Sequence, residues 1–336
     1  MPLDTLAYIS AGLALVGLMA YAILGGADFG GGIWDLFATG PRKHDQRRAI
    51  ATAMGPVWEA NHVWLIFVIV VLFTCFPSGF VKLATALFIP FHLALVGIML
   101  RGAAFVFRGH DLERSSGGAR RTIAWGAVFG VASVVSPVLL GAAFGAVTAG
   151  DLLNPLKAMP WLSVYGIACG LLALSTCAYL AAVYLVVETR GELREDFRRR
   201  AILAGTTTAA LAFAVLALAY FEARWFFDRM FSPLALPVVL AGLVFFAGSA
   251  WAVFTHKYRL SRWFAAGEVV LLILGWGLAQ QPYLAWPDLK ITQVVGPPAT
   301  IIFVLKALPV GAVVLVPSLW LLFKVFKGSK GSTAQA

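Results

Sequence analysis

The stretch Gly55-Pro-Val-Trp-Glu-Ala-Asn-His-Val-Trp64 runs without a break into the apolar residues Leu65 to Phe76. The combined segment is long enough to cross a bilayer, which takes about 20 residues of helix. It nevertheless contains Glu59, Asn61 and His62, and an ionisable side chain at the centre of a membrane helix costs about 2.5 to 3.5 kcal/mol on insertion scales. A sequence tolerates such a residue where it faces protein or water, so we expect Glu59 to handle protons or ions.

Composition places the chain in the membrane. Of its 336 residues, 60% are hydrophobic and 12% are charged, whereas soluble domains carry roughly 25% charged residues. The net charge of +10 follows from membrane topology, so no nucleic-acid partner is expected. Three cysteines without CxxC spacing argue against a disulfide framework and against a metal site.

Nine apolar segments approach the length of a membrane span. They are expected at 6–26, 53–76, 83–107, 122–147, 162–187, 200–221, 233–255, 264–285 and 301–324. No connection is long enough for a soluble domain, so residues 1–336 are predicted to form a single polytopic membrane domain. Nineteen of the 26 Lys and Arg residues fall in the odd-numbered connections and the C-terminal tail. The positive-inside rule therefore predicts a periplasmic N-terminus and a cytoplasmic C-terminus.

Arg101 lies in the third segment at about the same depth as Glu59 in the second. Because consecutive helices usually neighbour each other, we expect these two side chains to lie close together, directly or through water. The alternative is a buried ion pair that only joins two helices. Asp28 lies in the glycine-rich stretch 25–32, which has too many glycines for a regular helix interior. We expect this stretch to end the first helix irregularly near the same level, with Asp28 as a site residue or as a plain turn residue.

The aromatic and polar residues of the second segment are also candidates. Trp58, Asn61 and His62 share one face of the predicted helix, and Trp64 lies about 120° from Trp58 around it. These side chains either line a ligand site or fill a helix interface. His62 and His92 lie at different depths, so a haem held between them is not expected. Glu268, near the cytoplasmic end of the eighth segment, is expected at the membrane interface.

Several motifs together resemble a known family. They are Gly25-Gly-Ala-Asp-Phe-Gly-Gly-Gly32, Gly55-Pro-Val-Trp-Glu-Ala-Asn-His-Val-Trp-Leu-Ile66, Met99-Leu-Arg-Gly-Ala-Ala-Phe-Val-Phe-Arg108, Glu188-Thr-Arg-Gly-Glu-Leu193, Gln281-Pro-Tyr-Leu-Ala-Trp-Pro-Asp288 and Gly296-Pro-Pro-Ala-Thr300. The chain resembles subunit II of the cytochrome bd quinol oxidases over nearly its whole length. Its C-terminal pattern is most similar to the cyanide-insensitive branch.

The resemblance implies a complex that oxidises ubiquinol or menaquinol, reduces dioxygen to water and takes the protons for water from the cytoplasm, an electrogenic reaction. It implies that a partner, subunit I, carries haems b, haem d and the quinol site, and that this chain binds no cofactor. The expected fold is all-α, with nine transmembrane helices arranged as two four-helix bundles plus one extra helix. The expected location is the bacterial inner membrane, where a small single-helix accessory subunit is a further candidate partner.

In the family, the acid of the Trp-acid-x-Asn motif is associated with a proton route toward the oxygen-reducing haem. The resemblance gives this role to Glu59, with Trp58, Asn61 and Trp64 lining it, and with Asp28 and Arg101 beside it. The family often has an aspartate where this chain has Gly25, so any proton entry there must use another group. Two other functions remain open from the residues alone: a proton-coupled secondary transporter, and a membrane scaffold without chemistry of its own.

Overall fold

The computed structural model describes residues 1–113 and 119–328, with side chains at all of these except 56, 108–113, 119–123 and 322–328. Within this part of the chain, nine helices are long and apolar enough to cross a membrane. They are α1 (Leu3–Leu36), α2 (Lys43–Cys75), α4 (Phe88–Glu113), α5 (Ala119–Ala149), α6 (Val164–Glu188), α7 (Gly191–Glu222), α9 (Leu236–Phe254), α10 (Tyr258–Gln280) and α12 (Pro298–Gly328). The prediction of an all-helical, multi-pass membrane protein is confirmed.

Short elements fill the connections. They are α3 (Pro77–Ala86), the 3-10 turn η1 (Pro160–Leu162), α8 (Arg224–Met230), α11 (Ile291–Val294) and an antiparallel pair of strands, β1 (Tyr283–Ala285) with β2 (Leu289–Lys290). Two predicted spans differ in detail. The third, expected at 83–107, is divided at Leu87 between α3 and α4, and the eighth ends at Gln280, before the strand pair.

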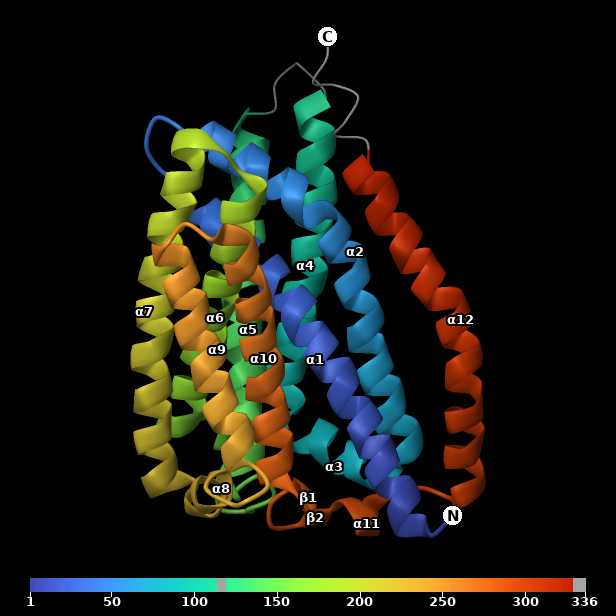
Figure 1. The fold of residues 1–336 in the computed structure, drawn as a ribbon. Helices are drawn as coiled ribbons and strands as arrows, with labels where there is room; N and C mark the ends of the chain where they lie inside the picture. Colours follow the sequence, from blue (N-terminus) through green and yellow to red (C-terminus); the bar gives the residue numbers. More distant parts are fainter. Residues whose placement is uncertain (114–118, 329–336) are drawn as a thin grey trace.

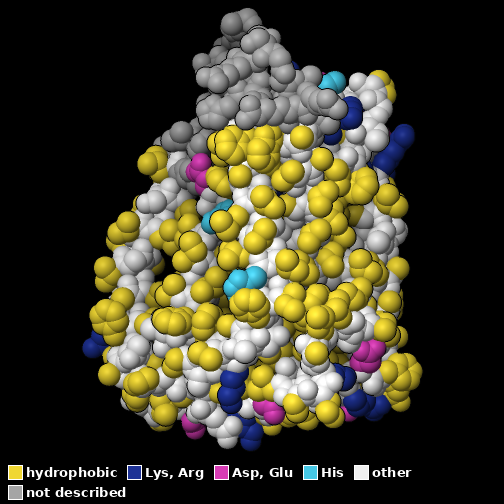
Figure 2. All heavy atoms as spheres, turned by 180° about the vertical axis from the view of Figure 1, so that it is seen from behind, with side chains coloured by type: hydrophobic (Ala, Val, Ile, Leu, Met, Phe, Trp, Pro, Cys, Tyr) yellow, Lys and Arg dark blue, Asp and Glu magenta, His cyan; other side chains and the backbone are white. Residues whose placement is uncertain are grey.

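The connections alternate between two ends of the molecule. In Figure 1, α3, α8, α11 and the two strands lie at the end that also holds the N-terminus, and the turns α1–α2, α6–α7 and α9–α10 lie at the other. Figure 2 shows hydrophobic side chains over the middle of one face, with Lys, Arg, Asp and Glu mainly near the ends. This is the surface expected of a chain that crosses a bilayer. Two basic residues that support the orientation, Arg114 and Lys330, lie outside the described residues.

Helix α1 lies at the centre of the packing, in contact with α2, α5, α6 and α10. Helices α4 and α5 pack against each other on one side of it, whereas α6 pairs with α7 and α9 pairs with α10 on the other. Helix α12 stands apart at the edge, beyond α2 (Figure 1), and its apolar stretch is only 6% buried. A grouping into two bundles plus one helix remains a prediction.

The glycine-rich stretch does not break α1, which continues as a regular helix to Leu36. Expecting an irregular end near Asp28 was wrong, because these glycines serve close packing instead. A Cβ at Gly30 would lie 1.9 Å from the carbonyl oxygen of Cys177 on α6, and one at Gly32 would lie 2.0 Å from Ser133 Oγ on α5. Small residues let membrane helices approach this closely, and the approach places the Asp28 side chain inside the bundle.

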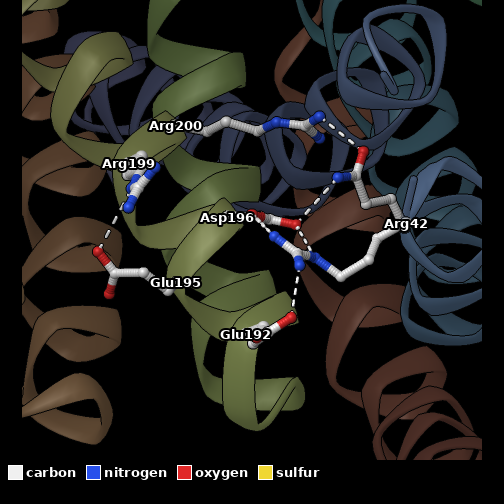
Figure 3. A network of polar contacts seen from close by, with 7 residues as sticks. Arg42, Glu192, Glu195, Asp196, Arg199 and Arg200 are labelled. Atoms are coloured by element: carbon white, nitrogen blue, oxygen red, sulfur yellow. Dashed lines mark hydrogen bonds and ion pairs between the residues drawn. The ribbon is translucent and has the colours of Figure 1, made fainter. Parts of the chain in front are cut away.

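A polar network ties the start of α2 to α7 (Figure 3). Arg42 donates to both carboxylate oxygens of Asp196, at 2.8 and 2.7 Å, and to Glu192 at 2.5 Å. Gln46 donates to Asp196 at 3.1 Å and accepts from Arg200 at 2.7 Å. The hydrogen bonds to Asp196 raise the pKa of Arg42 above its usual value. The network joins α2 to α7 at the end where the α1–α2 turn lies.

Candidate functional site

A buried ion pair lies at the centre of the candidate site. The Arg101 guanidinium on α4 binds both carboxylate oxygens of Asp28 on α1, one of them at 2.6 Å, and also donates to the Asp28 backbone carbonyl at 2.8 Å. Both side chains are almost fully buried, at 3% and 1% exposure. Charge-assisted, bidentate bonds of this kind are among the stronger ones in proteins, so α1 and α4 are held in one register.

Neighbouring helices complete the surroundings of the pair. Asn61 on α2 donates to Asp28 at 2.7 Å, and Arg101 Nε donates to Ser133 Oγ on α5 at 2.8 Å. The guanidinium also lies 5.4 Å from the ring centroid of Phe29 and 4.7 Å from that of Phe129, within the range of a cation–π interaction. Four helices therefore converge on one charge pair whose polar atoms are well satisfied.

Glu59 is not part of this cluster. Its side chain is exposed on the surface of the chain, and no hydrogen bond or ion pair joins it to another described residue. The predicted proximity of Glu59 and Arg101 is therefore wrong as a direct pairing, since Asp28 occupies the guanidinium. The reason is helical geometry. Asn61 faces Asp28, and a residue two positions earlier points about 200° away around the helix.

The aromatic residues of α2 divide between two surroundings. Trp58 stacks on Phe105 of α4 with ring centroids 5.8 Å apart, and it meets His62 edge-on at 5.3 Å. Its buried indole Nε1 has no hydrogen-bond partner among the described residues. Trp64 packs edge-on against Phe67 at 6.0 Å and lies away from the ion pair. Trp58 of the shared face thus contacts α4, and Asn61 contacts α1.

A small cavity of about 10 Å³ adjoins the ion pair, roughly the space that one water molecule needs. Its lining includes Tyr21, Asp28, Asn61, His62 and Arg101. The Tyr21 hydroxyl is buried without a partner among the described residues, and His62 Nδ1 bonds its own helix at the Trp58 carbonyl, 2.7 Å away. His62 Nε2 is then the ring nitrogen left for other partners. The cavity is polar enough to hold a water bonded to these groups.

The described residues contain no group of three or more His, Cys, Asp or Glu side chains that could hold a metal ion. His92 is exposed and bonds the Phe88 carbonyl at 2.8 Å, and it is not among the residues that line the cavity beside His62. The two histidines therefore do not face a common site. All three cysteines are free.

Comparison with known proteins identifies the family. The sequence model of the family "Cytochrome bd terminal oxidase subunit II" matches residues 6–326. The chain belongs to this family. A protein of Bacillus subtilis (strain 168), provisionally named cytochrome bd menaquinol oxidase subunit II, is 24% identical over 98% of each chain. Another, "Cytochrome bd ubiquinol oxidase subunit 2" from the same strain, is 29% identical over 68% of each chain.

The fold of this subunit II has a solved counterpart. A chain of the bd oxidase from Geobacillus thermodenitrificans superposes with a TM-score of 0.80 at 21% identity, covering 96% of this chain and 98% of that one. The likeness extends over the whole arrangement of helices, so the site described above lies within a fold that bd oxidases share.

Two members of the site could not be foreseen from the sequence. Ser133 lies in an apolar segment with no charged neighbour, and Tyr21 is one of eight tyrosines in the chain. The packing of α5 against α1 and α4 brings the Ser133 hydroxyl to Arg101. Tyr21 lies on α1 itself, seven residues before Asp28, and reaches the same cavity along the helix.

Proposed function

We propose that this subunit II works in a complex that oxidises quinol and reduces dioxygen to water, in the bacterial inner membrane. The proposed partner is a haem-bearing subunit I that holds haems b, haem d and the quinol site, while this chain binds none of them. Family membership over nearly the whole length supports the terminal-oxidase role. The relatives' names include both menaquinol and ubiquinol, so the donor is proposed only as a quinol.

The observation that carries the proposal is the position of Glu59. It lies near the start of the apolar part of α2, Val57–Cys75, and it is exposed on the isolated chain without a polar partner among the described residues. Exposed apolar residues on a membrane helix can face lipid, but a carboxylate at this level needs water or protein. We infer that the partner subunit covers this face and that Glu59 passes cytoplasmic protons toward it.

Glu59 shares one face of α2 with three other exposed side chains, and these four positions are called the α2 stripe. Thr52 lies seven residues before Glu59, and Ile66 and Phe73 follow it at seven-residue spacing. Seven residues are nearly two full turns of an α-helix, so the stripe runs along the helix from the predicted cytoplasmic end. This geometry suits a flat contact with one neighbouring protein along most of α2.

The Asp28–Arg101 pair has a different role in this proposal. Because Arg101 bonds both oxygens of Asp28, and Asn61 and Ser133 bond the pair in turn, the pair holds α1, α2, α4 and α5 together. It thereby positions α2 and the stripe that carries Glu59. His62, Tyr21 and the cavity between them offer a local path for a proton beside the pair.

The proposal is tested by isolating the complex from membranes through a tag on this chain. A haem-bearing larger subunit should co-purify, with haem bands in the reduced-minus-oxidised spectrum that the separated chain lacks. Glu59→Gln should slow oxygen consumption by about a hundredfold, a typical contribution of a proton-transfer group, at unchanged haem content. Thr52→Val, on the same stripe, is the matched control and should leave turnover unchanged.

Two results would count against this function. Recovery of the chain without a haem protein, together with solute movement in liposomes, would favour the transporter hypothesis. Normal turnover of Glu59→Gln in an intact complex would leave the chain as a scaffold and remove Glu59 from the proton route.

A further inference from the structure

A second acid lies inside the membrane part of the protein, away from the site above. Glu268 is on α10, within the apolar span Tyr258–Gln280, and only 8% of the residue is exposed. Glu268 therefore packs inside the helix bundle, and the interfacial position expected from the sequence remains a prediction. Its Oε2 atom is buried and has no hydrogen-bond partner among the described residues. This sets Glu268 apart from Asp28, whose carboxylate is bonded by Arg101 and Asn61.

The hydroxyl groups near Glu268 bond one another. Tyr179 on α6, which interacts electrostatically with Glu268, donates from its hydroxyl to Ser249 Oγ on α9 at 2.6 Å. Ser249 in turn donates to the Ser261 carbonyl on α10 at 3.2 Å. The hydroxyl donors of Tyr179 and Ser249 are thus already used, so neither is free to bond Glu268.

The basic groups of the neighbouring helices are engaged elsewhere. On α10, Arg262 forms an ion pair with Glu188 of α6 at 3.2 Å. On α7, Arg198 donates to the Val253 carbonyl at 3.2 Å and Arg194 to the Thr189 carbonyl at 2.8 Å. Helix α9 contains no charged residue, and Asp28 of α1 is held by Arg101. Arg259 of α10 is exposed, and no ion pair joins Glu268 to a cation whose side chain is described.

A buried carboxylate without a counter-ion or hydrogen-bond donor is strongly unfavourable, and such a group takes up a proton instead. We propose that Glu268 is held as a neutral carboxylic acid and forms a second proton-binding site within the α6–α7–α9–α10 part of the membrane domain. The site needs neither Glu59 nor the partner subunit. It therefore stands independently of the proposed oxidase function.

Infrared difference spectroscopy of the purified protein tests the proposal directly. The wild-type protein at neutral pH should show the carbonyl stretch of an unionised carboxylic acid that is absent from Glu268→Gln. The band should shift on transfer to heavy water, because the bound proton exchanges with solvent. Glu59→Gln should keep the band, since Glu59 is a different acid. Spectra of wild type and Glu268→Gln that match in this region would overturn the proposal.

The pH dependence of thermal stability gives a second measurement. In the unfolded chain Glu268 ionises above about pH 4.3, whereas in the bundle it keeps its proton, so wild type should lose stability as the pH rises from about 4.3 through neutral to alkaline values. Glu268→Gln should lose less over the same range and should unfold at a higher temperature than wild type at alkaline pH. Equal pH dependence of the two proteins would show that no buried acid titrates at this position and would contradict the inference.

Discussion

Removing the carboxylate of Asp28 should destabilise the protein strongly. In Asp28→Asn, the guanidinium of Arg101 keeps its position, at 3% exposure, but loses its counter-ion. Breaking a buried pair by removing one partner typically costs about 3 to 5 kcal/mol. This corresponds to roughly two to three and a half orders of magnitude in the folding equilibrium constant. The geometry favours a value within that range, because both carboxylate oxygens of Asp28 accept from Arg101 and one also accepts from Asn61.

The assay is thermal unfolding of the purified protein in detergent, followed by tryptophan fluorescence. At about 2 to 4 °C per kcal/mol for chains of a few hundred residues, the apparent midpoint should fall by about 10 °C. The double variant Asp28→Leu/Arg101→Met should regain most of the loss, because an apolar pair of similar volume often replaces a buried ion pair without penalty.

Glu59→Gln is the matched control for this experiment, since it changes an acid on α2 that has no described partner. Its midpoint should stay within about 1 °C of wild type, in line with the small effect of surface substitutions. An Asp28→Asn protein as stable as wild type would refute the assignment of Asp28 as the partner of Arg101. So would a Glu59→Gln protein that is destabilised as strongly as Asp28→Asn.

Three further predictions follow from the packing and the charges. Gly30→Ala should lower the unfolding midpoint, because its Cβ would lie 1.9 Å from the Cys177 carbonyl oxygen. Gly12→Ala on the same helix is the control and should leave the midpoint unchanged, since its Cβ would meet nothing within 4 Å. Equal midpoints of the two variants would contradict the close approach of α1 to α6. Arg42→Gln should lower the midpoint by more than Arg199→Gln, whose side chain is 78% exposed, and the difference should shrink in high salt. An equal effect of both substitutions would show that the Figure 3 network does not hold α2 against α7. Partial burial opposes ionisation of Asp151, yet hydrogen bonds from Lys157 and Asn154 outweigh it and lower the pKa of this carboxyl. The resulting stabilisation is complete above the unfolded-state pKa of about 3.9 and is lost as the pH falls through the lower folded-state pKa. Asp151→Asn should therefore reduce the loss of stability at acid pH, and an unchanged loss would contradict this role of Asp151.

Hydropathy alone was enough to predict the membrane spans. An apolar run of about 20 residues has few other folded states available, and the helices found in the described residues overlap all nine predicted segments. Helix ends were less predictable. α2 begins at Lys43 and α7 at Gly191, since polar residues continue a helix beyond the apolar part without any change in hydropathy.

The site was only partly predictable. Sequence position placed Asp28, Glu59 and Arg101 at similar depth, but depth does not determine which way a side chain faces around its helix. The choice between the two acids depended on the rotation of α2, which Asn61 fixes by bonding Asp28. The burial of Glu268 depends on how α6 and α9 pack against α10, and no local pattern of residues encodes that packing.

The central claim is that a partner protein covers the α2 stripe that carries Glu59. A photoreactive residue in place of Ile66, which is 60% exposed on that stripe, tests it in intact membranes, with Phe213 on α7, 72% exposed, as the matched control position. The account predicts a cross-link from position 66 to a haem-bearing subunit and none to that subunit from position 213. Cross-links from position 66 to lipid alone would contradict it.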